Sequence, residues 1–126
     1  MNLRPLANIL AANSLGVLGT SMFFNMLPAE AEEAILLRNP LSGTKIDYEL
    51  KGYFKTEFQL IVRSHSYANG EVLIKKVIDA LTLENTQVED HNFNYSRPRT
   101  EAVAFPLSRG NLLEFNVMFD VCFVRS

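Results

Sequence analysis

The sequence of 126 residues has little of several residue types: it contains one cysteine, no tryptophan and 6 glycines. A single cysteine, Cys122, excludes a disulfide bond within the chain. It lies in a strongly apolar, alternating segment, where a free thiol usually behaves as a small hydrophobic group rather than as a reactive nucleophile. This cysteine usage is compatible with a reducing compartment.

The sequence also lacks an excess of charge of either sign, since 12 Lys and Arg residues stand against 14 Asp and Glu residues and give a formal net charge of -2. This balance does not favour an avid nucleic-acid binder or a basic membrane-surface protein. No segment approaches the ~20 uninterrupted apolar residues of a membrane-spanning helix. The apolar N-terminal stretch is interrupted by Asn8, Asn13 and Ser14, which argues against a signal peptide. We therefore expect a soluble protein that is made in the cytoplasm and binds no membrane.

Motifs that carry chemistry are absent as well. His65 and His91 have no cysteine or carboxylate at metal-ligand spacing, so we expect ordinary surface histidines. The sequence contains no glycine-rich phosphate loop, no G-x-S-x-G nucleophile elbow and no Cys-His pair at a recognised spacing. The acidic cluster Glu30, Glu32 and Glu33 has the pattern of a solvated run rather than of a general acid and base. The sequence therefore predicts a protein that is not an enzyme and uses no metal or cofactor.

What the sequence does contain is an apolar fraction of 48% beside 21% charged residues, the balance of an ordinary globular domain. Its length fits a single domain over residues 1–126. Hydrophobic periodicity, capping residues and turn signals predict the order of the elements. They are a helix at 3–13, strands at 21–27 and 34–38, a loop or hairpin connection at 39–52, a strand at 54–63, a helix at 67–81, strands at 81–88, 91–95 and 100–106, a turn at 109–111, and a final strand at 114–123.

Three of these elements indicate how the chain folds. The strand at 54–63 has one apolar face and one charged face, as expected of a half-buried strand. The final strand alternates five large apolar residues with polar ones and is predicted to be central. The helix at 67–81 has an apolar stripe, formed by Tyr67, Ile74, Ile78 and Leu81. The order of helices and strands excludes a repeated β-α-β arrangement, so we predict an α+β fold: a mainly antiparallel β-sheet with two α-helices packed on one face.

A small basic patch is the one feature that suggests a ligand. Arg97, Arg99 and Arg109 lie near the aromatic residues Phe93 and Tyr95, and nucleic-acid modules interleave arginine and aromatic side chains in this way. Contact with an acidic partner protein, or simple solvation, explains three arginines in an acidic chain as well. A small nucleic-acid-binding module therefore stays open as an alternative.

Three segments together resemble the tail terminator proteins of long-tailed bacteriophages. The connection at 38–47 (RNPLSGTKID) is similar to an R-[ND]-P-x-[ST]-G-x-x-I-D motif. The segment 52–63 (GYFKTEFQLIVR) is similar to a strand of the pattern G-Y-[FY]-x-x-x-F-Q-[LV]-I-V-R, and Tyr67 supplies the aromatic residue that opens the following helix. The helix before Phe23–Pro28 (FFNMLP) also fits. The resemblance covers about residues 3–81.

This resemblance implies a structural virion subunit that forms a ring, usually a hexamer. The ring caps the tail tube, ends its polymerisation and joins the tail to the head or neck, so its implied partners are copies of itself, the tail tube protein and head-closure or neck proteins. DNA passes through the channel without specific binding, and Glu30, Glu32 and Glu33 are candidates for its lining. Another neck component, such as a head-closure or tail-completion protein, is the alternative within this class. The interface candidates are motif residues: Arg38, Asp47, Tyr53, Arg63 and Tyr67.

Overall fold

The structure is a computed structural model that describes residues 1–107 and 111–125. Of the predicted turn at 109–111, Arg109 and Gly110 lie outside the described residues. The described chain forms two helices and seven strands. In chain order these are α1 (Arg4–Ala12), β1 (Met22–Phe24), β2 (Ala34–Arg38), β3 (Tyr53–Ser64), α2 (Tyr67–Leu81), β4 (Leu83–Val88), β5 (His91–Pro98), β6 (Val103–Pro106) and β7 (Leu113–Arg125).

All seven strands belong to one sheet, built around the long antiparallel pair β3–β7. The strand order is β1-β2-β3-β7-β5-β4. β6 also pairs with β7, along the N-terminal part that β5 leaves free. Among the named strands β1 and β2 pair in parallel and the other pairs are antiparallel. The predicted mainly antiparallel sheet is confirmed, and the final strand is central as predicted.

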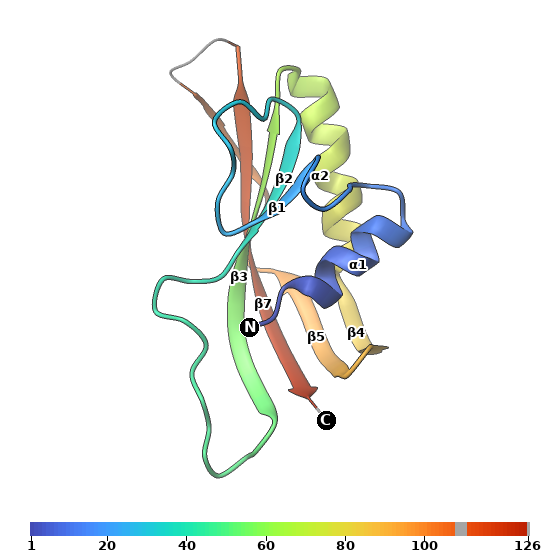
Figure 1. The fold of residues 1–126 in the computed structure, drawn as a ribbon, viewed down its shortest axis with the longest axis vertical. Coiled ribbons are helices and arrows are strands. Elements are labelled where there is room, and N and C mark those ends of the chain that lie inside the picture. The colour runs from blue at the N-terminus through green and yellow to red at the C-terminus, as the bar shows by residue number, and fades with distance from the viewer. Residues whose placement is uncertain (108–110, 126) are drawn as a thin grey trace.

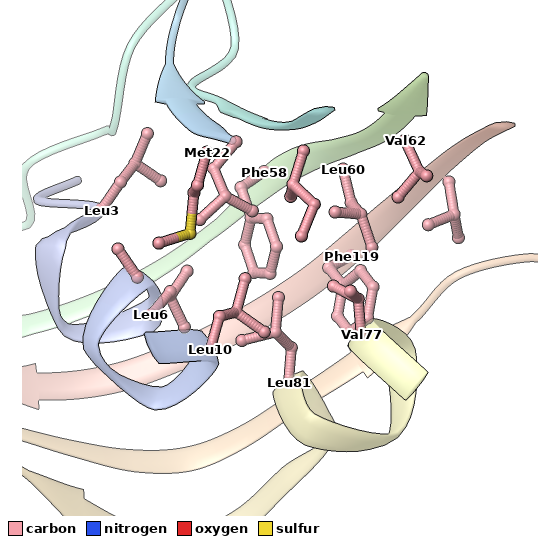
Figure 2. Close-up of a cluster of buried hydrophobic side chains, with 14 of the residues drawn as sticks. Leu3, Leu6, Leu10, Met22, Phe58, Leu60, Val62, Val77, Leu81 and Phe119 are labelled. Atoms are coloured by element: carbon pink, nitrogen blue, oxygen red, sulfur yellow. The ribbon is translucent and has the colours of Figure 1, made fainter. Parts of the chain in front are cut away.

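Both helices lie on one face of the sheet, as predicted (Figure 1). Figure 2 shows Leu6 and Leu10 of α1 and Leu81 of α2 pointing toward the sheet residues Phe58 and Phe119. These side chains are fully buried, and the two phenyl rings stack with centroids 4.9 Å apart. Burying one side chain of this size contributes about 1.5–3 kcal/mol. The alternating patterns of β3 and β7 therefore produce one continuous core beneath the helices.

Helix α2 begins where Ser66 caps it, because the Ser66 hydroxyl oxygen accepts a hydrogen bond from the Asn69 amide at 3.3 Å. Its orientation differs from the predicted one. Tyr67 and Ile78 do not belong to the fully buried stripe, and Tyr67 is 57% exposed. The buried residues are Gly70, Ile74, Val77 and Leu81.

Gly70 explains this orientation. A Cβ atom at Gly70 would lie 2.9 Å from Cδ1 of Phe115 and would overlap its Cε1. Since glycine has no side chain, the helix can rest directly on the phenyl ring of β7. The apolar stripe read from the sequence counts only side chains that are present, so it could not reveal this contact.

The prediction of a surface histidine at position 91 is wrong. His91 is 0% exposed and is the first residue of β5. Its ring stacks with Phe93, with centroids 5.8 Å apart, and lies 4.9 Å from the ring of Phe123. Nδ1 lies 2.7 Å from Oδ1 of Asp90, and this hydrogen bond lowers the pKa of Asp90 below its usual 3.8. The side chain lies on the helix side of the sheet, where packing against Phe93 of β5 and Phe123 of β7 buries it.

A candidate protein-contact surface

The face of the sheet opposite the helices is called the open face here. It carries alternate side chains of β3 and β7, which are mostly polar or charged. Arg38 of β2 donates from Nε to Oε1 of Gln59 at 2.9 Å, and Gln59 Nε2 donates to Oδ1 of Asn116 at 2.7 Å. This row of hydrogen bonds links β2, β3 and β7 across the face. The open face is therefore an ordered polar surface rather than a second core.

Arg63 ties the loop between β1 and β2 to the open face. Its guanidinium forms an ion pair with Glu114 at 2.9 Å and donates hydrogen bonds to the carbonyl oxygens of Pro28 at 3.1 Å and Ala31 at 3.0 Å. In Figure 1 this loop, coloured blue to cyan, lies on the side of the sheet away from the helices. Arg63 thus has a structural role as well as a place on the surface.

Arg99 is held between two carboxylates. Its guanidinium contacts Asp120 Oδ1 at 2.6 Å and also pairs with Glu57, and these hydrogen bonds raise its pKa above the usual value. Glu57 and Asp120 are directly opposite each other on β3 and β7. The arginine therefore neutralises a pair of acids that would otherwise repel.

The structure weakens the interpretation of the predicted basic patch as a nucleic-acid site. Phe93 is fully buried and cannot stack on a ligand, although Arg97 lies over the ring of Tyr95 at 4.1 Å. Arg99 is engaged with its two acids, and Arg109 lies outside the described residues. Among the described residues of the patch, one arginine, Arg97, stacked on one half-buried ring, Tyr95, is less than the series of aromatic platforms in a basic groove that a nucleic-acid module uses.

Residues 39–52, which we call the arm, form the longest segment without helix or strand in the described chain. Hydrogen bonds to the two ends of the chain, Met1 and Arg125, hold both ends of the arm. The amino group of Met1 donates to Oδ1 of Asn39 at 2.9 Å and to Oγ1 of Thr44 at 2.7 Å. At the other end the Arg125 amide donates to the Gly52 carbonyl at 2.7 Å. Gly52 has φ +79°, and a Cβ there would lie 2.6 Å from the Arg125 carbonyl oxygen.

The arm exposes apolar side chains. Asp47 Oδ1 accepts hydrogen bonds from the amides of Glu49 at 2.9 Å and Leu50 at 3.2 Å, which fixes a turn near its tip. Four large apolar residues of the arm project into solvent: Leu41, Ile46, Tyr48 and Leu50. A cluster of this kind on a small protein usually marks a surface that another protein covers.

A hollow of about 770 Å³ lies on the helix side of the sheet, between α2 and the chain that leads into β6. We call it the α2–β6 groove. Most of the residues that line this groove are apolar or aromatic: Tyr67, Ile74, Ile78, Pro98, Ala102, Ala104 and Phe115. Glu71, Lys75, Arg99, Thr100 and Glu101 also line it. Tyr67 contacts Phe115, with ring centroids 5.5 Å apart.

The structure does not bring the five predicted interface residues together. Arg38, Tyr53 and Arg63 lie on the open face, where a hydrogen bond with the Cys122 thiol raises the pKa of Tyr53 above 10.0. Asp47 shapes the arm, and Tyr67 lines the α2–β6 groove on the other side of the sheet. The exposed apolar residues of the arm and the groove itself were missed. The alternation of Ile46, Tyr48 and Leu50 was the available signal for the arm.

The acidic cluster and the histidines do not form a metal site. Nε2 of His65 lies 2.8 Å from Oε2 of Glu32, and Glu33 accepts a hydrogen bond from the His65 amide at 2.9 Å. Within residues 1–107 and 111–125, no three His, Cys, Asp or Glu side chains are placed to share a metal ion. In the same part of the chain, neither helix is long and apolar enough to cross a membrane.

Fold and surface together define a class: a small α+β subunit whose main exposed features are an apolar arm and an apolar groove, as in proteins that contact other proteins. The family model described as "Bacteriophage tail terminator protein" matches residues 9–119. The chain belongs to that family, as the sequence motifs indicated. It is therefore a structural protein of the phage tail or neck and a component of the virion.

A solved structure has the same fold. A chain of the "Virion of native gene transfer agent (GTA) particle" is similar with a TM-score of 0.66, over 94% of this chain and 91% of that chain. The two sequences are 16% identical, so the likeness concerns the fold alone. A comparison with curated protein sequences gives no match.

Proposed function

We propose that copies of this chain assemble into a closed ring, a hexamer, that binds the last ring of the tail tube protein, ends tube polymerisation and joins the tail to head-closure or neck proteins. The family membership supports this proposal. The observation that carries it is the arm, because four exposed apolar side chains gathered on one segment favour burial against a protein partner. A subunit with two different contact surfaces assembles head to tail, and such contacts form a ring when the rotation between neighbours closes after a whole number of subunits.

The role is mechanical and involves no catalysis, metal or cofactor. The subunit assembles in the host cytoplasm and ends in the tail–neck region of the virion. DNA passes through the ring without specific binding. Three arginines of the open face support this point, since Arg38, Arg63 and Arg99 are each engaged by side chains of the same sheet. A protein with a net charge of -2 has little affinity for phosphates.

Light scattering on a sizing column tests the ring, with the protein alone and mixed with its tail tube protein. Six copies of a 14.2-kDa chain give about 85 kDa. A ring in solution, or a monomer that forms one on the tube, supports the proposal. A monomer that ignores the tube overturns it.

Capping is tested by adding the protein to polymerising tube protein and measuring tube lengths by electron microscopy. We expect shorter tubes whose ends carry one extra ring. Tubes of unchanged length would overturn the capping role even if the ring forms. A DNA-binding titration at ~0.15 M salt should show no binding, because the net charge is -2 and Arg38, Arg63 and Arg99 are already engaged within the subunit.

A further inference from the structure

We infer that the arm of one subunit occupies the α2–β6 groove of the next copy in the ring. This inference rests on the proposed ring and adds to it the two surfaces that meet. The arm supplies Ile46, Tyr48 and Leu50, and the groove supplies an apolar floor that includes Ala104 and Phe115.

The arm cannot fill the groove of its own subunit. It leads from β2 into β3, and its residues Pro40 to Lys45 line a hollow with Lys55 and Glu57 on the open face. The groove lies on the helix side of the sheet and beside β6, which pairs with the opposite edge of β7. In Figure 1 the arm is the long teal-green loop at the lower left, and α2 lies at the upper right. Only another copy can therefore bring an arm to the groove.

The placement of the two surfaces also fits a ring. Each subunit has one arm and one groove, on opposite sides of the β3–β7 pair. A contact between two different surfaces of identical subunits is head to tail, and it forms a ring when the rotation between neighbours closes. Every arm then has a groove, and no apolar surface of either kind remains exposed.

The chemistry of the two surfaces is complementary. Apolar residues alternate with charged ones along the tip of the arm, in the sequence Lys45, Ile46, Asp47, Tyr48, Glu49, Leu50, Lys51. The apolar groove is likewise bordered by charges of both signs, Glu71, Lys75 and Glu101. Apolar side chains in the groove with charges at its border are the usual anatomy of a protein interface. A hollow of about 770 Å³ has room for several side chains of the arm.

The arm is also ordered before it binds. Asn39 and Thr44 are held by the amino group of Met1, and Gly52 is held by the Arg125 amide. The turn at Asp47 fixes the tip. An interface segment that is already shaped loses less conformational entropy on binding, which strengthens the contact.

Charged substitutions test the inference by breaking the ring. Tyr48→Asp places a charge on the arm, and Ala104→Arg fills the groove. Val17→Asp is the matched control, because Val17 is 61% exposed and lies outside both surfaces. Light scattering should show a rise of at least ~10-fold in the concentration needed for the ring in the first two variants and no change in the control. Circular dichroism checks that each variant is folded.

Cysteine cross-linking gives a second readout that locates the contact. In a Cys122→Ala background, Tyr48→Cys and Ala102→Cys subunits are mixed and oxidised, and a covalent dimer is expected only from the mixture. Val17→Cys mixed with Ala102→Cys should give none. A chain with both cysteines at 48 and 102 should give a ladder of cross-linked oligomers, whereas an internal disulfide would leave a monomer and contradict the inference.

The outcomes separate the two proposals. If the ring forms but tolerates both Tyr48→Asp and Ala104→Arg and gives no cross-link, the arm–groove contact is overturned and the ring stands. If the wild-type protein forms no ring even with tube protein, the proposed function is overturned, and the arm–groove contact with it.

Discussion

The guanidinium of Arg63 lies 2.9 Å from the Glu114 carboxylate, directly across the β3–β7 pair. The same guanidinium donates to the carbonyl oxygens of Pro28 and Ala31, so one side chain connects the central strands with the loop on the open face. Both partners of the ion pair are largely buried, with 12% and 21% of their side chains exposed. Such a pair restrains the surrounding structure more than an exposed pair does.

Arg63→Ala should therefore lower the free energy of unfolding by about 1–3 kcal/mol, because it leaves the Glu114 carboxylate and two backbone carbonyls without their donor. Urea unfolding measures this loss. Hydrogen exchange should also become faster in residues 26–33. Lys55→Ala, on the exposed part of the same strand, is the control and should change stability by less than ~0.5 kcal/mol. Unchanged exchange in the loop would contradict the tethering role.

Gly70→Ala tests the close approach of α2 to the sheet. Alanine is ordinarily favoured over glycine within a helix by ~1 kcal/mol. Here the added Cβ would overlap the ring of Phe115, so we expect a net loss of about 1–3 kcal/mol. Thermal and urea unfolding measure it. Val72→Ala, at a half-exposed position of the same helix, is the control. A Gly70→Ala protein more stable than wild type would show that α2 does not rest on Phe115.

The hydrogen bond between Asp90 and His91 should make the free energy of unfolding depend on pH in the acid range. The hydrogen bond with His91 lowers the pKa of Asp90 below 3.8 in the folded state, so the pair stabilises the protein at pH values above 3.8. This contribution is lost as pH falls through the lower pKa of the folded protein. Carboxyl NMR titration should show the lowered pKa in the wild type and a return toward 3.8 in His91→Phe. His65→Phe should leave the pKa of Asp90 unchanged, and an ordinary pKa in the wild type would contradict the pairing.

Removing Arg99 should expose the repulsion between the two acids that it holds. Arg99→Ala leaves Glu57 and Asp120 facing each other without a cation, so their repulsion should destabilise the fold at pH 7. All three side chains are more than a third exposed. Screening by solvent therefore limits the loss of stability to about 1 kcal/mol or less. Raising the salt concentration screens the repulsion between the acids and should reduce the loss.

Arg97→Ala is the matched control for Arg99, since Arg97 stacks on Tyr95 and contacts neither acid in the described structure. Urea unfolding at pH 7, at low salt and at ~1 M salt, compares the two variants. An Arg99→Ala loss that is equal at both salt concentrations would contradict the electrostatic explanation.

Local pattern predicted much of the fold. The alternation of β3 and β7 depends only on which residues are apolar, and strands place successive side chains on opposite faces. The end of β2 at Arg38 follows from the Asn39-Pro40 sequence, and the start of α2 follows from the Ser66 cap. These features are local, so neighbouring residues suffice to predict them.

The candidate surfaces were harder to predict. The motif residues Asn39, Asp47 and Gly52 were found, and the structure shows them building the arm. The groove could not be found, because its lining comes from α2, the β5–β6 connection and β7, which are far apart in the sequence. The contacts of Arg99 also join three separate strands or their ends.

The sequence by itself determined the α+β class, the two long amphipathic strands and the motifs of the tail terminator family. Each of these depends on residue type and spacing along the chain. Only the tertiary structure decided that His91 is buried and that Gly70 sets the orientation of α2. It also decided that the arm and the groove lie on opposite sides of the sheet. These properties arise where distant segments meet, and burial and contact at such places are set by packing in three dimensions rather than by local pattern.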